Sequence, residues 1–117
     1  MRFEERELKP YAEPVIPNLL TEGEVYFSVQ FADDDMLIPI METWVFAGRK
    51  LDPEDEEGQL YFQDLESYRQ GIRYASATAD NAHFQLATEK STNHIFEYER
   101  ALDQLMLCSL RRRKASR

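Results

Sequence analysis

The sequence predicts an α+β fold, in which a curled antiparallel sheet or partly open barrel of four to five strands is packed by one long C-terminal helix. Two patterns predict it. Apolar and polar residues alternate in several segments between positions 23 and 90, as in half-buried strands. Apolar residues then recur at three- and four-residue spacing within 91–113, as in an amphipathic helix. A sheet needs its apolar face covered, and this helix is the only large apolar element left to cover it.

Composition indicates one globular domain that spans residues 1–117. Hydrophobic residues make up 43% and charged residues 31% of the chain, which is an ordinary globular balance. The single cysteine, Cys108, excludes an intrachain disulfide. The first ten residues are too charged for a signal peptide, and no apolar run reaches the length of a membrane span. We therefore expect a cytoplasmic protein without a membrane partner.

Charge is unevenly distributed along the chain. The net charge is −8, but the last seven residues, 111–117, carry five of the 14 basic residues and no acid. The rest of the chain therefore has nine basic residues against 22 acidic ones, a balance of −13. An acidic body repels nucleic acid and attracts basic proteins. Basic residues also suit the last turn of a helix, so we expect the basic tail to stabilise the helix rather than to bind nucleic acid.

The first half of the chain is predicted to hold an arm and a long hairpin. Residues 1–22 contain three of the five prolines and are expected to be extended. Residues 23–32 and 36–51 are predicted strands joined by an acidic turn at 33–35, and 52–58 is too polar to pack. The arm is expected to lie along the domain through four apolar residues: Val15, Ile16, Leu19 and Leu20.

The second half is predicted to complete the sheet. A third strand is expected at 59–64, followed by a short helical turn that Asp64 caps and Gly71 ends. Two further alternating segments, 72–79 and 83–89, are predicted to pair as a hairpin.

The C-terminal helix is predicted over 91–113, overlapping the basic tail. Acidic residues in its first turn and basic residues in its last turn match the helix dipole. Its apolar stripe is expected to pack on the sheet. The stripe consists of Ile95, Tyr98, Leu102, Leu105, Met106 and Ser109.

A single carboxylate, Glu42, interrupts the apolar second strand. With a three-residue hairpin turn, Glu42 lies opposite Tyr26 on the face that points away from the core. A bulge at Pro39 would shift the pairing by one residue, bringing Trp44 and Phe46 into the core but burying Glu42 as well. Burying a lone carboxylate costs several kcal/mol. The unbulged register, with Glu42 exposed, is therefore favoured.

The favoured register leaves a large apolar and aromatic surface around Glu42. Exposed patches of this size commonly mark an interface. An alternative explanation carries equal weight, namely that the N-terminal arm or the rest of a curled sheet covers this surface within the same chain. The predicted binding surface consists of Tyr26, Ile38, Ile40, Glu42, Trp44 and Phe46.

The leading functional hypothesis is a non-catalytic protein-interaction module. It would use this surface to form a homodimer or to hold a basic protein partner. The alternative is a small ligand-binding barrel or enzyme in which Glu42 is the acid or base beside Tyr26 and Trp44. Glu42 is the only candidate catalytic residue, because no nucleophile elbow, phosphate-binding loop or dinucleotide fingerprint is present.

No cofactor or metal site is predicted. The acidic loop 52–57 lacks the glycine and the final glutamate of a calcium-binding loop, although a weak cation site at 52–57 or 33–35 is left open. His83 and His94 have no ligand-like spacing, so zinc is not expected. Cys108 lies among leucines of the helix and is predicted to be a packed thiol.

Overall fold

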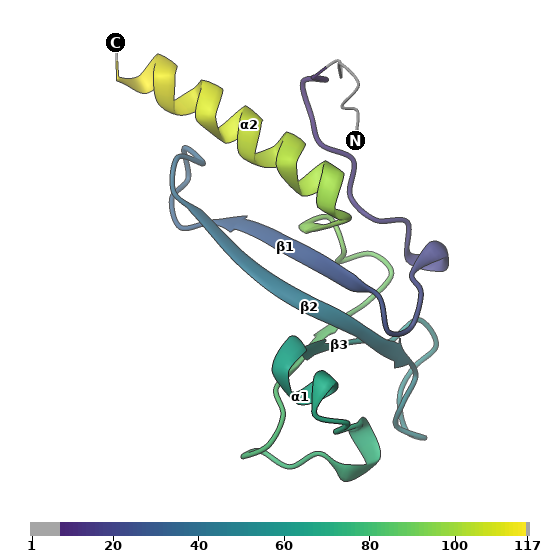
Figure 1. The fold of residues 1–117 in the computed structure, drawn as a ribbon. Helices are drawn as coiled ribbons and strands as arrows, with labels where there is room; N and C mark the ends of the chain where they lie inside the picture. Colours follow the sequence, from purple (N-terminus) through teal and green to yellow (C-terminus); the bar gives the residue numbers. More distant parts are fainter. Residues whose placement is uncertain (1–7, 117) are drawn as a thin grey trace, which may run out of the picture.

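The computed structural model describes residues 8–116 and has an α+β fold, so the predicted fold class is confirmed (Figure 1). A five-stranded antiparallel sheet, in the order β4-β3-β2-β1-β5, is not closed into a barrel. The first seven residues of the predicted arm and the last residue of the basic tail lie outside the described residues. The elements are η1 (Pro17–Leu19), β1 (Val25–Phe31), β2 (Pro39–Arg49), β3 (Leu60–Asp64), α1 (Leu65–Arg69), η2 (Tyr74–Ser76), β4 (Phe84–Ala87), β5 (Ile95–Phe96) and α2 (Tyr98–Ala115).

The sheet buries apolar side chains on both of its faces, because successive residues of a strand point to opposite sides. On the helix face, a cluster that includes Val29, Phe96 and Ala101 packs α2 against β1 and β5. On the opposite face, a larger cluster joins side chains of β1, β2 and β3 with the arm. That cluster consists of Leu20, Tyr26, Trp44, Phe46, Leu60, Phe62, Ala87 and Ile95.

The β1–β2 hairpin keeps the predicted faces but not the predicted pairing. Glu42 lies opposite Ser28 instead of Tyr26, which is a shift of two residues. A shift of two leaves every side chain on its expected face. The pairing is regular as far as Phe31 and Pro39, so the bulge considered at this proline is not formed.

A longer turn explains the shifted pairing. The backbone N–H of Ala32 donates to the carbonyl of Ile38 (2.9 Å), so the turn is longer than the three residues expected. The Asp33 carboxylate closes it by accepting from the N–H groups of Leu37 (3.0 Å) and Ile38 (2.9 Å). Met36 takes a positive φ of 58°, a left-handed conformation that an extended strand residue would not adopt.

The arm is docked by fewer residues than predicted. The N–H of Val15 donates to the carbonyl of Ile95 (2.9 Å), and Leu20 is buried. Ile16 and Leu19 are 60% and 70% exposed, so the expectation that all four apolar residues face the domain is wrong for these two. Ile16 directly precedes the turn η1 and Leu19 ends it, and none of the residues of this turn is buried.

The predicted strand at 72–79 is wrong, because this segment contains the single turn η2. Its aromatic residue, Tyr74, packs against side chains of the sheet and does not belong to a strand. The ring of Tyr74 makes edge contacts with the rings of Tyr61 (5.1 Å) and Phe84 (5.8 Å). Its hydroxyl donates to Asp52 (2.8 Å), which ties the segment to the acidic loop.

The C-terminal helix begins later than predicted. Ile95 and Phe96 form the short edge strand β5, with Phe96 opposite Phe27 of β1. The extended backbone of Glu97 then starts α2 at Tyr98, rather than near residue 91. Two residues are too few for alternation to be visible in the sequence, so the strand was hidden by the helical pattern that follows it.

The short helix α1 is capped as predicted. The Asp64 carboxylate accepts from the N–H of Ser67 (3.0 Å), and Gly71 follows the helix with a φ of 90°. The side-chain amide of Gln63, which is fully buried, donates to the Ser67 hydroxyl and to the carbonyl of Ile72 (both 2.8 Å). These bonds hold α1 over β2 and β3.

The basic end of α2 is tied to the tip of the β1–β2 hairpin. The Arg111 guanidinium donates to the carbonyl of Met36 (3.0 Å), and that of Arg112 donates to the carbonyl of Leu37 (2.9 Å). The buried Cys108 thiol lies 3.5 Å from the same carbonyl of Met36. The predicted packed thiol is confirmed, and two charges of the basic tail have a structural role.

Candidate functional site

The predicted aromatic surface is not exposed. Tyr26, Trp44 and Phe46 keep only 5%, 7% and 0% of their surface open to solvent, so the expectation of an exposed face is wrong for these three residues. The rings of Tyr26 and Phe62 approach to 6.5 Å although β2 lies between their strands. Strands two apart in a flat sheet are separated by roughly 9.5 Å, so the sheet curls toward this face. Curling and the arm residue Leu20 together cover the aromatics.

Glu42 marks the point where this buried face meets water. It is exposed, as predicted, and so are Ile38 (55%) and Ile40 (46%) on the same face nearer the hairpin tip. Two residues further along β2, Trp44 is already inside the core. The six predicted site residues are therefore divided into a buried aromatic half and an exposed half.

The two aromatic residues expected beside Glu42 have structural partners. The Trp44 ring stacks on the His83 imidazole (6.1 Å between centroids), and the Tyr26 hydroxyl accepts the N–H of Thr21 (2.9 Å). A general acid or base in a ligand site needs an enclosed position within reach of its substrate. The solvent-exposed position of Glu42 does not provide such an enclosure.

The acidic loop uses its carboxylates to hold tyrosines. Asp52 accepts the hydroxyl of Tyr74 (2.8 Å), and Asp55 accepts that of Tyr61 (2.5 Å). Burial and the neighbouring Asp55 carboxylate raise the pKa of Tyr61 far above its ordinary value, so this phenol stays protonated. The hydroxyl groups therefore anchor the loop to β3 and η2.

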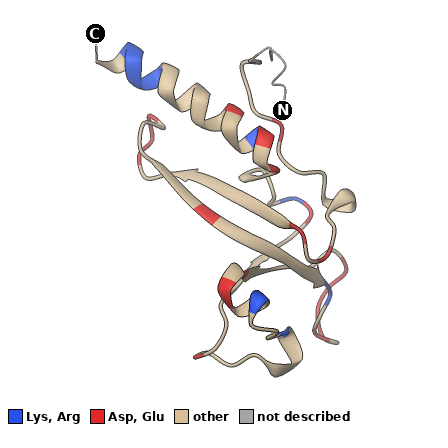
Figure 2. Cartoon of the chain, viewed as in Figure 1, with Lys and Arg blue, Asp and Glu red and all other residues tan. Residues whose placement is uncertain are grey.

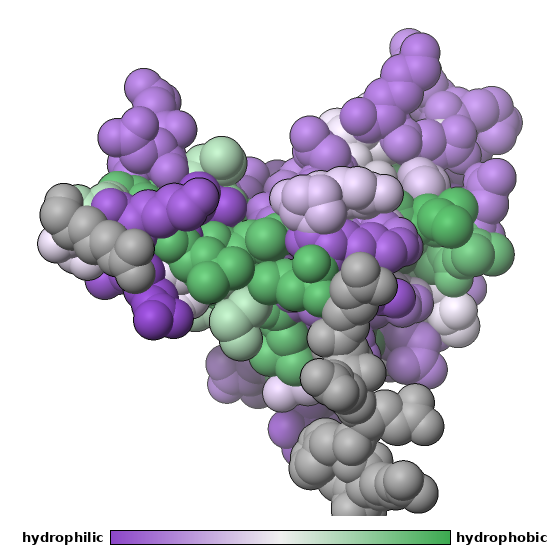
Figure 3. All heavy atoms as spheres, turned by 90° about the horizontal axis from the view of Figure 1, so that it is seen from above, coloured by the Kyte–Doolittle hydropathy of each residue, from purple (hydrophilic) through white to green (hydrophobic). Residues whose placement is uncertain are grey.

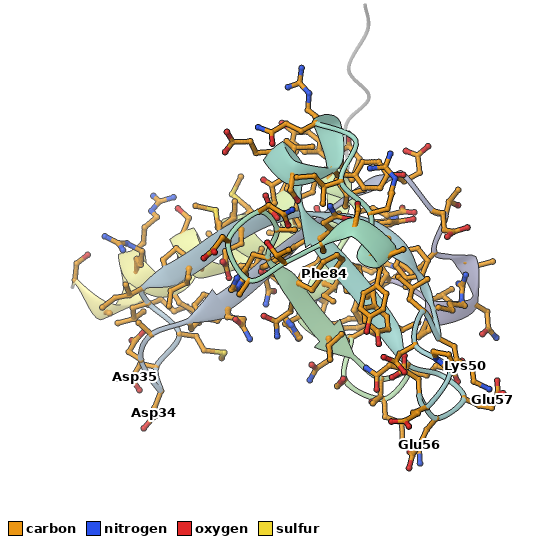
Figure 4. The ribbon with its side chains drawn as sticks, turned by 90° about the horizontal axis from the view of Figure 1, so that it is seen from below. Asp34, Asp35, Lys50, Glu56, Glu57 and Phe84 are labelled. Carbon is orange, nitrogen blue, oxygen red and sulfur yellow. The ribbon has the colours of Figure 1, made fainter. Side chains whose placement is uncertain are left out.

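Four other acidic side chains of the two loops point outward. Figure 4 shows Asp34 and Asp35 projecting from the hairpin tip, and Glu56 and Glu57 from the loop after β2. Lys50 forms an exposed ion pair with Glu57 (2.8 Å). Within residues 8–116, no three His, Cys, Asp or Glu side chains are grouped closely enough to hold a metal ion. The structure therefore gives no support to the weak cation sites that the sequence left open.

The outer side of α2 carries an apolar stripe, and sequence reasoning had assigned three of its four residues to the core. Tyr98, Leu102, Met106 and Leu110 are 58%, 41%, 53% and 41% exposed and follow one another at intervals of four residues. Residues at this spacing lie on one side of a helix. We call these four residues the α2 stripe.

Small residues explain why the stripe faces outward. The buried side of α2 carries Ala101, which packs with Val29 and Phe96 of the sheet, and Cys108, seven residues later, which lies against the hairpin turn. These short side chains let the helix lie close to β1 and the hairpin turn, while Leu105 packs at the margin of the contact. Leu102 and Met106 were predicted to pack on the sheet, and that expectation is wrong because the smaller residues occupy this position. Tyr98 only touches the edge of Phe27 (5.6 Å).

A shallow groove lies beside the middle of the stripe. It has a volume of about 490 Å³ and is lined by Leu102, Leu105 and Met106 together with Leu8 of the arm, Asp103 and Ser109. Figure 3 shows apolar side chains gathered along this side of the molecule. Within residues 8–116, no helix is long and apolar enough to cross a membrane.

The two ends of α2 have opposite charge (Figure 2). Glu97 and Glu99 are exposed at its beginning, and Arg113 and Lys114 are exposed at its end. Arg111 and Arg112 are engaged with the hairpin tip. The stripe therefore runs from an acidic end to a basic end.

A second hollow lies between the arm and the sheet. It has a volume of about 210 Å³ and is lined by apolar arm residues, Tyr26, and the charged side chains of Glu13, Glu97 and Arg100. Arg100 donates to Asp103 (3.1 Å), and the hydroxyl of Tyr26 is bonded to the arm. Arg100 and Tyr26 are therefore already bonded within the fold.

Comparison with protein-family models, with curated proteins and with solved structures finds no match to this chain. Its surface is therefore the basis for a functional proposal. The signal for the stripe is present in the sequence, because the helix has two apolar sides. Only the position of the small residues Ala101 and Cys108 indicates which side meets the sheet.

Proposed function

We propose that the protein is a non-catalytic interaction module that associates with a second copy of itself through the α2 stripe. The observation that carries this proposal is the row of four exposed apolar residues at four-residue spacing. Isolated exposed apolar residues are ordinary, but a contiguous row on one helix is typical of a contact surface.

The energy available from the stripe suits a reversible contact. Fully burying one large apolar side chain contributes about 1.5–3 kcal/mol, and the stripe residues are about half exposed. Each would then contribute roughly 1 kcal/mol per copy, before the loss of rotational and translational freedom is subtracted. The eight stripe residues of a pair would together contribute roughly 8 kcal/mol, which corresponds to micromolar affinity before that loss is subtracted, so we expect a weak, concentration-dependent dimer rather than a permanent one.

Self-association can be tested with a matched pair of variants. Met106 and Met41 are 53% and 57% exposed, but only Met106 belongs to the stripe. We expect the untagged wild-type protein and Met41→Glu to form dimers as concentration rises, and Met106→Glu to stay monomeric, in sedimentation and native mass spectrometry. Both variants should unfold at wild-type denaturant concentrations, since neither side chain is buried.

A wild-type protein that stays monomeric up to millimolar concentration would overturn this proposal. The stripe would then serve another protein or be covered by residues 1–7. Equal loss of dimers in both variants would also overturn it, because the effect would then follow from added charge and not from the stripe.

A further inference from the structure

Resting on the proposed function, we infer that the second copy lies antiparallel, with the two α2 helices related by a two-fold axis beside Met106. This inference names the orientation and register of the partner, which self-association alone does not require.

The stripe is self-complementary about Met106. Leu102 and Leu110 stand four residues before and after it and are equally exposed, at 41%. A two-fold axis at Met106 therefore places Leu102 of each copy against Leu110 of the other, with the two Met106 side chains in contact. Rows of residues at four-residue spacing are one of the ridges by which helices pack. Each ridge then packs into the groove beside the ridge of the other copy, so the stripe residues nearest Met106 are buried on both copies.

Ridge packing permits either direction, and charge selects between them. In the antiparallel direction, Glu97 and Glu99 of each copy lie beside Arg113 and Lys114 of the other. In the parallel direction, acidic ends meet acidic ends and basic ends meet basic ends, which is repulsive. The helix dipoles add to the same preference, because the partly positive beginning of one helix then lies beside the partly negative end of the other.

A two-fold contact also closes the assembly. The exposed Ile40 at the start of β2 and Ile38 just before it offer a second apolar surface, and a stripe docked there would leave both surfaces open on the outer copies. Such a contact would continue into a ring or a filament instead of a dimer. The self-complementary stripe avoids this, since each copy uses the same surface.

Disulfide formation between introduced cysteines tests the orientation. Leu102→Cys, Met106→Cys and Leu110→Cys are made in a Cys108→Ser background, with Leu86→Cys as an exposed control away from α2. If Cys108→Ser impairs folding, the native thiol is kept, because it is only 2% exposed. The full-length proteins are oxidised at a concentration where the wild type is dimeric, and covalent dimers are counted on non-reducing gels.

The antiparallel arrangement predicts a distinct set of products. Met106→Cys should cross-link to itself, and a mixture of Leu102→Cys with Leu110→Cys should give mixed dimers. Each of the last two alone should give no more product than Leu86→Cys. Their identical positions would be eight residues apart along the axis, about 12 Å, which exceeds the span of a disulfide.

Other outcomes separate this inference from the proposal beneath it. Efficient cross-linking of Leu102→Cys to itself would indicate parallel helices and overturn the antiparallel pairing while leaving self-association intact. Dimers in sedimentation without mixed Leu102–Leu110 products would overturn the register about Met106. Monomers at every concentration would overturn the proposed function itself.

Discussion

Replacement of Trp44, the only tryptophan, should destabilise the protein strongly. Its indole is 7% exposed, belongs to the cluster on the opposite face, and stacks on His83. Truncation of a buried tryptophan or phenylalanine to alanine costs about 3–5 kcal/mol, part of which is the cavity left behind. A chain of 117 residues has a total stability of about 6–18 kcal/mol. Trp44→Ala should therefore remove a large share of it.

The assay is urea unfolding followed by circular dichroism at a concentration where the protein is monomeric. Tyr11→Ala is the control, because this aromatic side chain is 61% exposed and its loss should change stability by less than about 1 kcal/mol. A loss below about 1 kcal/mol in Trp44→Ala would refute the curled sheet. It would mean that the indole is exposed and that the aromatic surface is available for binding after all.

Three further predictions concern the polar anchors. Asp64→Ala should lower the unfolding free energy by about 1–2 kcal/mol. Although partial burial acts to raise the pKa of Asp64, hydrogen bonds from Ser67 and from the His83 backbone hold it below its ordinary value. The stabilisation is therefore complete above the unfolded-state pKa of about 3.9 and is lost as the pH falls through the folded-state value, so urea unfolding of wild type and variant should converge in acid. Arg111→Ala should speed amide exchange at residues 36–38, whereas Arg113→Ala should not, because Arg111, unlike Arg113, donates to the carbonyl of Met36 at the hairpin tip. The Cys108 thiol should react with a thiol reagent only on unfolding, and rapid native-state labelling would mean that α2 separates from the hairpin.

Patterns within short stretches of the sequence predicted those strands and helices that depend mainly on residues close to one another in the chain. Alternation located β1, β2, β3 and β4, and the Asp64 cap and the glycine stop located α1. The exposure of Glu42 followed from the energy of burying a carboxylate. In each case the governing interaction acts within a few residues or on a single group.

The buried aromatic face could not be predicted in the same way. Whether Trp44 and Phe46 are covered depends on how far the sheet curls, and that depends on contacts between β1 and β3 across β2. The sequence also has no local sign that Ile95 and Phe96 pair with β1. The side of α2 that meets the sheet was misassigned because periodicity favours large apolar residues, whereas close packing favoured Ala101 and Cys108.

The anchoring of α2 at both ends affects how its outer side would bind. Its beginning follows directly from β5 within the sheet, and its end is fixed by the guanidinium groups of Arg111 and Arg112 on the hairpin carbonyls. A helix held in this way is already formed before any encounter. Little conformational entropy is then lost on association, so a weak apolar row can be sufficient for recognition. The hairpin tip therefore holds in place the helix whose outer side we propose for self-association.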